Sequence, residues 1–189
     1  AEKKLDEAVA QAAADHPGRP VEVWAEDEHR LGLKPIRRRV WAPMGQRPIA
    51  LGHHRYQWLH VAAFVQPTSG EAVWYLCSGL SKPFFAELLA AFARETGAGR
   101  RRSIVLVLDN AGWHGPEGLT VSDGISLVFL PPYSPDLNPI EQVFAKLKAI
   151  LRKAAARTKA ALGEALARSL DGFPLQECQN YIRNSGYSG

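Results

Sequence analysis

An almost wholly apolar run from Ser103 to Leu108 (SIVLVL) is the feature that most constrains the fold of this chain. A strand with apolar side chains on both faces must be covered on both sides, as the central strands of α/β sheets are. Asp109 follows the run directly. The sequence therefore predicts an α/β protein with a buried central strand whose carboxyl end carries an acid.

A second strand is predicted from Val21 to Ala25 (VEVWA), and it leads into the acidic triplet Glu26–Glu28. Side chains alternate between the faces of a strand, so Asp27 shares one face with the odd-numbered strand residues, and its two acidic neighbours point to the other. Acids at a strand end can also serve solubility alone, which is the alternative interpretation. If a right-handed crossover returns the Ser103–Leu108 strand parallel to this one, Asp27 and Asp109 end side by side.

The other segments complete a mixed sheet of about five strands flanked by helices. Further strands are predicted at Tyr56–Gln66, Glu71–Cys77 and Ile125–Leu130, and helices at residues 1–15, from Ser81 to about Gly97, from Ile140 to about Arg157, at Lys159–Leu170 and at Pro174–Ile182. Between the first two strands lies Leu31–Gly52, a Pro- and Arg-rich insertion that we expect to form a small hairpin.

Three carboxylates form the candidate reaction centre. Asp27 and Asp109 stand at the ends of strands expected to be parallel, where open α/β sheets bind ligands, and Glu141 lies at the start of a predicted helix. Clustered carboxylates repel one another, and hard cations such as Mg²⁺ or Mn²⁺ neutralise them through oxygen ligands. Two such ions can grip the attacking and the leaving oxygen of a phosphodiester displacement. The pattern therefore predicts metal-dependent phosphoryl transfer.

These residues also have ordinary structural interpretations. Asn138 to Glu141 (NPIE) fits a capping box, in which the acid serves the start of the helix. Asp109 followed by Asn110 fits a polar pair that leads from a strand into a turn. His114 is either a turn histidine or a contact to the scissile phosphate or to a metal-bound water. The predicted position of both aspartates at strand ends favours the functional interpretation.

Basic residues occur in clusters, although the formal net charge of +4 is mild. Two clusters are candidates for DNA contact, namely Arg37, Arg38 and Arg39 and, within one predicted helix, Lys146, Lys148, Arg152 and Lys153. Lysine and arginine neutralise DNA phosphates, and a merely solvated face is the alternative. Between Glu141 and Glu164 no other acid interrupts the second cluster, so we expect that helix to present one positive surface.

Cysteine usage and hydropathy restrict the setting of the protein. Cys77 and Cys178 lack the spacing of a zinc site or a disulfide framework, which fits a reducing cytoplasm. No run approaches the roughly 20 apolar residues of a membrane helix, and the first residues lack the pattern of a signal peptide. We therefore expect a cytoplasmic protein without membrane association.

Four motifs resemble the IS630/Tc1/mariner superfamily of transposases, within the RNase H-like group of DDE enzymes. They are AEDEHRLGL around Asp27, RRRVWAPMGQRP from Arg37, LDNAGWH from Leu108 and LPPYSPDLNPIEQVFAKLK from Leu130. The last two together are highly specific, whereas DN or NPIE alone is weak. The similarity runs from about Val21 to Arg157.

The resemblance implies an RNase H-like fold with Asp27, Asp109 and Glu141 as the catalytic, metal-binding triad, in which Asp27 bridges two Mg²⁺ or Mn²⁺ ions. It also implies DNA cleavage by water, followed by attack of a 3′ hydroxyl on target DNA. Asn110, His114 and Asn138 are candidates for supporting this active site.

We therefore expect a DDE transposase catalytic domain that acts at transposon ends, in a prokaryotic cytoplasm or nucleoid. Residues 1–20 are expected to form a leader helix and linker, residues 21–157 the catalytic domain and residues 158–189 its C-terminal helical extension. The helix-turn-helix half that binds DNA in such transposases is expected to be missing or on another chain, and a homodimer is a candidate assembly. The alternatives are an RNase H-like nuclease without strand transfer and an accessory DNA-binding fragment that no longer cuts.

Overall fold

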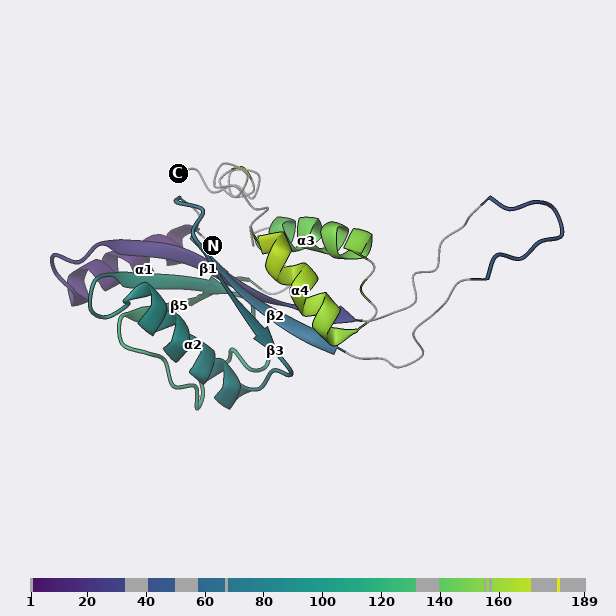
Figure 1. Ribbon diagram of the computed structural model, residues 1–189. Coiled ribbons are helices and arrows are strands. Elements are labelled where there is room, and N and C mark those ends of the chain that lie inside the picture. The colour runs from purple at the N-terminus through teal and green to yellow at the C-terminus, as the bar shows by residue number, and fades with distance from the viewer. Residues whose placement is uncertain are drawn as a thin grey trace.

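The computed structural model describes residues 2–32, 41–49, 58–66, 68–131, 140–154, 156, 158–170 and 180, and these contain one five-stranded sheet of order β3-β2-β1-β4-β5 (Figure 1). The strands are β1 (Val21–Gly32), β2 (Trp58–Val65), β3 (Ala72–Cys77), β4 (Ser103–Leu108) and β5 (Ile125–Phe129). The helices are α1 (Glu2–Asp15), α2 (Lys82–Thr96), α3 (Ile140–Ala154) and α4 (Lys159–Leu170). The predicted mixed sheet with flanking helices is confirmed.

Some predictions fall outside these residues. They concern Arg37, Arg38, Arg39, Asn138, Cys178 and, apart from Asn180, the helix expected from Pro174 to Ile182. None of the described helices combines the length and the apolar composition needed to cross a membrane.

β4 is the buried central strand that the apolar run predicted. All six of its residues are buried, because helices cover the sheet and β4 lies between β1 and β5. β1 pairs with it in parallel, and the last matched residues are Ala25 and Val107. Asp27 and Asp109 each stand two residues beyond that pair. The expected parallel arrangement of the two acid-bearing strands is confirmed.

β1 extends further than predicted. It continues to Gly32 because β2 pairs with it in antiparallel fashion from Ala25 onward. Asp27 therefore lies within a strand, opposite Ala63, rather than at a strand end. Beyond Ala25, the ladder with β4 has stopped. Within the described part of the chain, no strand therefore pairs with that edge of β1 at the position of Asp27.

Two apolar clusters cover the two faces of the sheet. One joins Trp24 of β1 and Leu106 of β4 to α2, whose buried face includes Phe92. The other joins Leu31 and the odd-numbered residues of β2 to α3 and α4. The period-2 alternation of β1 thus sends its even-numbered side chains toward α2 and its odd-numbered side chains toward α3.

Local signals explain where α2 begins and ends. Ser81 caps its first turn by accepting a hydrogen bond from the backbone N–H of Phe84, as the sequence predicted. Gly97 ends it in a left-handed conformation, with φ 76°. The helix is thereby confined to the crossover between β3 and β4.

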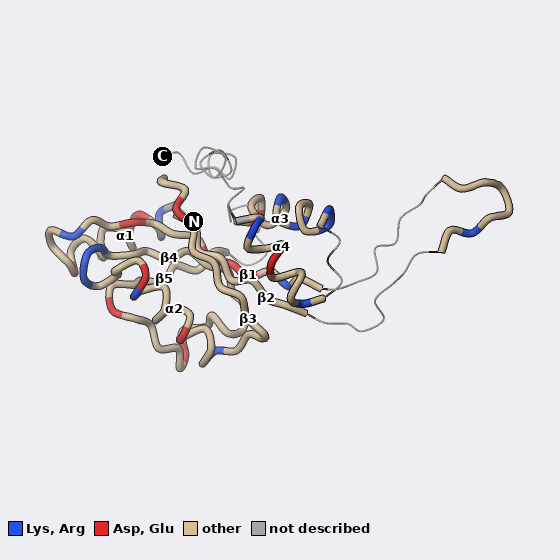
Figure 2. Tube along the Cα trace, in the orientation of Figure 1, with Lys and Arg blue, Asp and Glu red and all other residues tan. Residues whose placement is uncertain are grey.

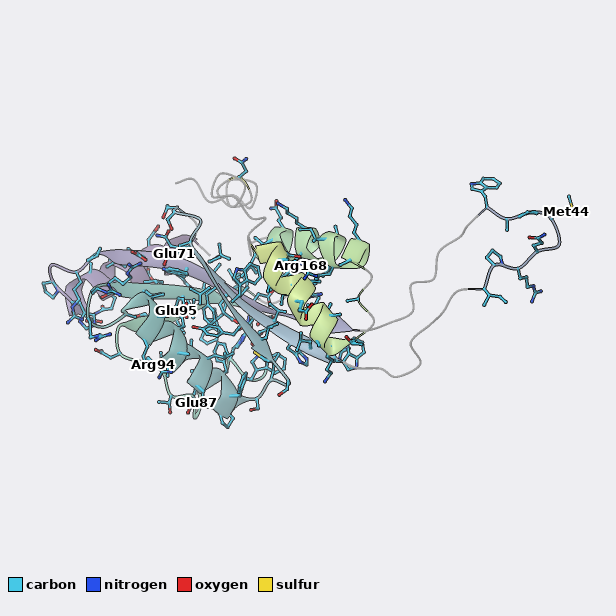
Figure 3. The ribbon with its side chains drawn as sticks, in the orientation of Figure 1. Met44, Glu71, Glu87, Arg94, Glu95 and Arg168 are labelled. Carbon is cyan, nitrogen blue, oxygen red and sulfur yellow. The ribbon has the colours of Figure 1, made fainter. Side chains whose placement is uncertain are left out.

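Residues at the N-terminus and in the insertion behave differently. α1 contacts β1, β4 and β5, so it packs on the sheet, and the expected division at residue 20 stays a prediction. The segment 41–49 lies apart from the sheet, with Met44 at its far end (Figures 1 and 3). Within that segment the structure contains a turn closed by Gln46 N–H and the Pro43 carbonyl, and no strand of the expected hairpin.

Candidate active site

The structure brings the three predicted acids toward one another from three elements. Asp27 lies on the side of β1 that faces α3, Asp109 directly follows β4, and Glu141 stands exposed in the first turn of α3. Burial and then the carboxylates of Glu141 and Asp109 raise the pKa of Asp27 to about 7. Because carboxylates act on a neighbour's pKa only at short range in a protein, Glu141 and Asp109 lie near Asp27.

The spacing of these acids is open. Among the described residues, Glu26, Glu28 and His114 are the group of three acid or histidine ligands whose atoms all lie within 4.8 Å of one another. Asp27, Asp109 and Glu141 do not meet that criterion. The candidate triad is therefore an open set of carboxylates beside a second, tightly packed acidic cluster.

His114 is the centre of the packed cluster and is 0% exposed. Its Nδ1 lies 2.8 Å from Oδ1 of Asp109, and its Nε2 lies 3.2 Å from Oε1 of Glu28 and 3.5 Å from Oε2 of Glu26. Glu26 is also fully buried. The interpretation of Glu26 and Glu28 as acids that serve solubility is therefore wrong: they face the α2 side of the sheet and contact a buried histidine.

This packing separates the acid–base properties of the acids. Burial alone lowers the pKa of His114, but hydrogen bonds to Asp109 and Glu28 and the charge of Glu26 raise it to about 10. The hydrogen bond from His114 lowers the pKa of Asp109 below its usual value. Burial, and then the charge of Glu28, raises the pKa of Glu26 well above its usual value. His114 therefore holds Asp109 as an ionised carboxylate.

Backbone and side-chain hydrogen bonds fasten the segment that follows β4. Ala111 N–H donates to Oδ1 of Asp109 at 2.8 Å. The side-chain amide of Asn110 donates to the carbonyl of Leu130, just beyond β5, at 2.6 Å. Asn110 thus ties the ends of two neighbouring strands together and orders the loop that carries Asp109.

Lys and Arg residues are spaced along α3 (Figure 2), and helical geometry divides the four candidate DNA-contacting residues between two flanks of the helix. An α-helix turns by roughly 100° per residue. Lys148 and Arg152 therefore share a flank with Glu141, while Lys146 and Lys153 share the opposite flank. The buried face of α3 lies between the two.

Lys148 is the basic residue that approaches the site. His29 lies on β1 two residues beyond Asp27, on the same face. Burial lowers the pKa of His29 to about 4, and the charge of Lys148 contributes. The ring of His29 also lies 5.3 Å from that of Phe144 on α3. The flank of α3 with Glu141 and Lys148 thus faces the surface of β1 that carries Asp27.

Sequence reasoning missed Glu26 and Glu28 as members of the site. Two signals pointed to them: they are in phase with Trp24, a side chain typical of a core, and the motif LDNAGWH supplies a histidine close to Asp109. Neither signal identified the contact, because 86 residues separate Glu28 from His114.

Comparisons with known proteins agree with this architecture. The model of a family described as DDE superfamily endonuclease matches residues 22–163. An uncharacterized protein, y4pE/y4sA of Sinorhizobium fredii, is 38% identical over 87 residues, which cover 46% of this chain and 63% of that protein.

Solved structures are similar in fold. The Mos1 strand transfer complex matches with a TM-score of 0.62 and 16% identity over 97% of this chain and 56% of that chain. The mariner Mos1 paired end complex with Mg matches with a TM-score of 0.59 and 15% identity, over 97% and 58%. The chain thus spans less than two thirds of these relatives. The predicted RNase H-like fold is confirmed.

Proposed function

The chain belongs to the DDE superfamily endonuclease family, and on that premise we propose that it is a transposase catalytic domain that cleaves DNA and transfers the cut strand. The observation that carries the proposal is the meeting of three carboxylates around Asp27, whose pKa burial, Glu141 and Asp109 raise to about 7. Carboxylates that oppose one another's ionisation favour the binding of a cation that neutralises them.

The acids fit hard divalent ions. Asp27, Asp109 and Glu141 offer oxygen donors only, which Mg²⁺ and Mn²⁺ prefer, and a cation would relieve the repulsion that raises the pKa of Asp27. Asp27, Asp109 and Glu141 would hold these ions, and the binding of two ions is part of this proposal. Bound ions of this kind activate a water molecule and stabilise the oxygen that leaves phosphorus.

The reaction has two displacements at phosphorus. Water attacks a phosphodiester and the bond to the 3′ oxygen breaks, leaving a 3′ hydroxyl and a 5′ phosphate. The 3′ hydroxyl then attacks a phosphodiester of target DNA, and the 3′ oxygen of the target strand leaves. Asp109, kept ionised by His114, and Asp27 hold their carboxylates at the reacting phosphate in both steps.

Basic residues near the triad supply contacts to the DNA backbone. Lys148 and Arg152 follow Glu141 along one flank of α3, so phosphates that reach the triad pass close to them. Arg37, Arg38 and Arg39 remain predicted DNA contacts. Because the chain spans less than two thirds of its relatives, recognition of transposon ends by a helix-turn-helix half and assembly into a homodimer are further parts of this proposal.

Nicking of a supercoiled plasmid tests the proposal. With Mg²⁺ or Mn²⁺ we expect the chain to nick the plasmid and an Asp109→Ala variant to leave it intact. The matched control is Glu87→Ala, an exposed acid on the outer side of α2, which should nick like the unaltered chain (Figure 3). If Asp109→Ala cuts as well as the control, the assignment of the site is wrong.

A second assay separates the alternatives. A labelled oligonucleotide with a free 3′ hydroxyl should become joined to the plasmid. Nicking without joining, together with cleavage of an RNA–DNA hybrid, indicates a nuclease without strand transfer. Binding of the plasmid by the unaltered chain without nicking indicates an accessory DNA-binding fragment.

A further inference from the structure

Glu28 is hydrogen-bonded directly to Asp27 and, through His114, indirectly to Asp109. Its backbone N–H donates to Oδ1 of Asp27 at 2.7 Å. Its side-chain Oε1 lies 3.2 Å from Nε2 of His114, whose Nδ1 lies 2.8 Å from Oδ1 of Asp109. Asp27 on β1 is therefore linked to Asp109 after β4 through the backbone and side chain of Glu28 and the ring of His114.

The middle of this path is held in place on several sides. Trp113 Nε1–H donates to the same Oε1 of Glu28 at 2.9 Å. The ring of Phe85, from α2, lies 4.4 Å from the ring of His114. Side-chain exposure is 0% for His114 and 4% for Glu28. A buried pair with this many contacts cannot change its rotamers freely, so its geometry is transmitted to the groups it bonds.

Asp109 needs such support more than Asp27 does. It stands in the loop after β4, with its side chain 53% exposed, where no strand pairing orders it. Both of its side-chain hydrogen bonds from described residues, from Ala111 N–H and from His114, go to Oδ1. Oδ2 thus keeps its acceptor capacity for a ligand while Oδ1 orients the group.

We propose that Glu28 and His114 form a positioning pair that sets the separation and orientation of Asp27 and Asp109. The inference rests on the proposed function of that site as a metal centre. His114 touches neither the ions nor the DNA; it acts through Asp109, and Glu28 acts through His114 and through its own backbone N–H. The pair therefore determines how tightly the site holds a divalent ion.

Two amide replacements separate positioning from a structural role. The amide nitrogen of asparagine can stand where Nδ1 of histidine stood, and that of glutamine where Nε2 stood. His114→Asn therefore keeps a donor for Asp109, and His114→Gln keeps a donor for Glu28 only. The probe is Mn²⁺, whose free concentration electron paramagnetic resonance reports without any enzymatic turnover.

We expect His114→Asn, which keeps the donor for Asp109 but loses the contact with Glu28, to bind Mn²⁺ about threefold more weakly than the unaltered chain. We expect His114→Gln to bind at least tenfold more weakly, about the loss typical of a missing ligand support. His16→Asn and His16→Gln, on the loop after α1, are the matched controls and should bind Mn²⁺ normally. Equal affinities for the two His114 variants would overturn the proposal. If His114→Asn binds Mn²⁺ more tightly than His114→Gln but the unaltered chain does not nick the plasmid, the proposed function is overturned and the positioning pair is not.

A measurement on the unaltered chain covers the case in which neither His114 variant folds. The ring Nδ1–H of His114 is buried, so its proton should exchange slowly and give a separate resonance in nuclear magnetic resonance spectra. Addition of Mg²⁺ should shift that resonance, because its acceptor, Asp109, becomes a metal ligand. A resonance that stays in place at saturating Mg²⁺ also contradicts the proposal.

Discussion

The two faces of β1 use their acids in opposite ways. On the face toward α3, Asp27 lies near Asp109 and Glu141, and burial and these charges raise its pKa to about 7. On the face toward α2, Glu26 and Glu28 surround His114, which can carry a positive charge between them, although burial and the charge of Glu28 still raise the pKa of Glu26. Among the described residues, no basic side chain offsets the charge of Asp27, whereas His114 supplies a positive charge beside Glu26 and Glu28.

This difference separates binding from support. A carboxylate that no described cation offsets is costly until a ligand neutralises it, so in the proposed metal site Asp27 would contribute affinity for a divalent ion at the expense of stability. Glu28, whose buried side chain contacts His114 and Trp113, contributes to stability instead. Adjacent residues of one strand therefore do both tasks, because alternation sends them to different environments.

The largest expected difference is between the nicking rates of two variants, each with one acid substituted on one face of β1. Asp27→Asn should lower the rate of plasmid nicking by about a thousandfold or more, since a metal-binding carboxylate supports several kcal/mol of transition-state stabilisation. Glu26→Gln, one residue away, should lower the rate by less than about tenfold. Rates are measured from single-turnover nicking at saturating Mg²⁺. Similar losses for both variants would show that the two faces do not divide these tasks.

The next largest effect is expected on stability, when Glu28 on the α2 face of β1 is substituted. Glu28→Ala should lower the free energy of unfolding by about 3 kcal/mol, because it removes the acceptor of the Trp113 indole N–H and the nearer of the two carboxylates beside Nε2 of His114. Glu28→Gln keeps an oxygen acceptor and should lose about 1 kcal/mol. Urea denaturation followed by circular dichroism measures both. A larger loss for glutamine than for alanine contradicts the assigned contacts.

The pH dependence of stability tests the unusual ionisation of Asp27. Its pKa of about 7 in the folded chain lies above the ordinary value of 3.8, so the folded state binds more protons and loses stability as the pH rises from about 4 to about 7. Asp27→Asn removes that loss. Above pH 7 the variant should therefore be more stable than the unaltered chain by about 2 kcal/mol, which is less than the full pKa difference implies because solvent screens the charge.

Thermal unfolding of both chains between pH 4 and pH 8 measures this difference, and subtracting the two curves cancels the titration of the other groups. Saturating Mg²⁺ should narrow the gap by stabilising only the unaltered chain. A gap that is independent of pH would mean that Asp27 titrates normally in the folded state.

The flanks of α3 give the smallest expected effect. Lys148→Glu should weaken binding of plasmid DNA by about tenfold at low salt and reduce the salt dependence, since Lys148 lies on the flank of Glu141 and acts on His29 of β1. Lys146→Glu, on the other flank, should weaken binding by about twofold through net charge alone. Fluorescence anisotropy at several salt concentrations measures both. If the two variants weaken DNA binding equally, DNA does not lie preferentially along the flank of α3 that carries Glu141 and Lys148.

Much of the fold followed from local patterns along the chain. The apolar run of β4 indicated a strand buried on both faces, and its six buried residues agree. Alternation in β1 separated Asp27 from its acidic neighbours before any contact was known. Ser81 and Gly97 marked the ends of α2 through their capping preferences. These features depend on a few consecutive residues, so the sequence alone determines them.

What Glu26 and Glu28 contact was decided only by the tertiary structure. A local pattern shows that they share a face with Trp24, but the histidine that meets them arrives from 86 residues further along the chain than Glu28, after the crossover has returned to the sheet. The length of β1 likewise depended on β2, which pairs with it beyond Ala25. Side-chain direction is a local property of a strand, whereas burial and charge compensation depend on which distant segment is packed against it.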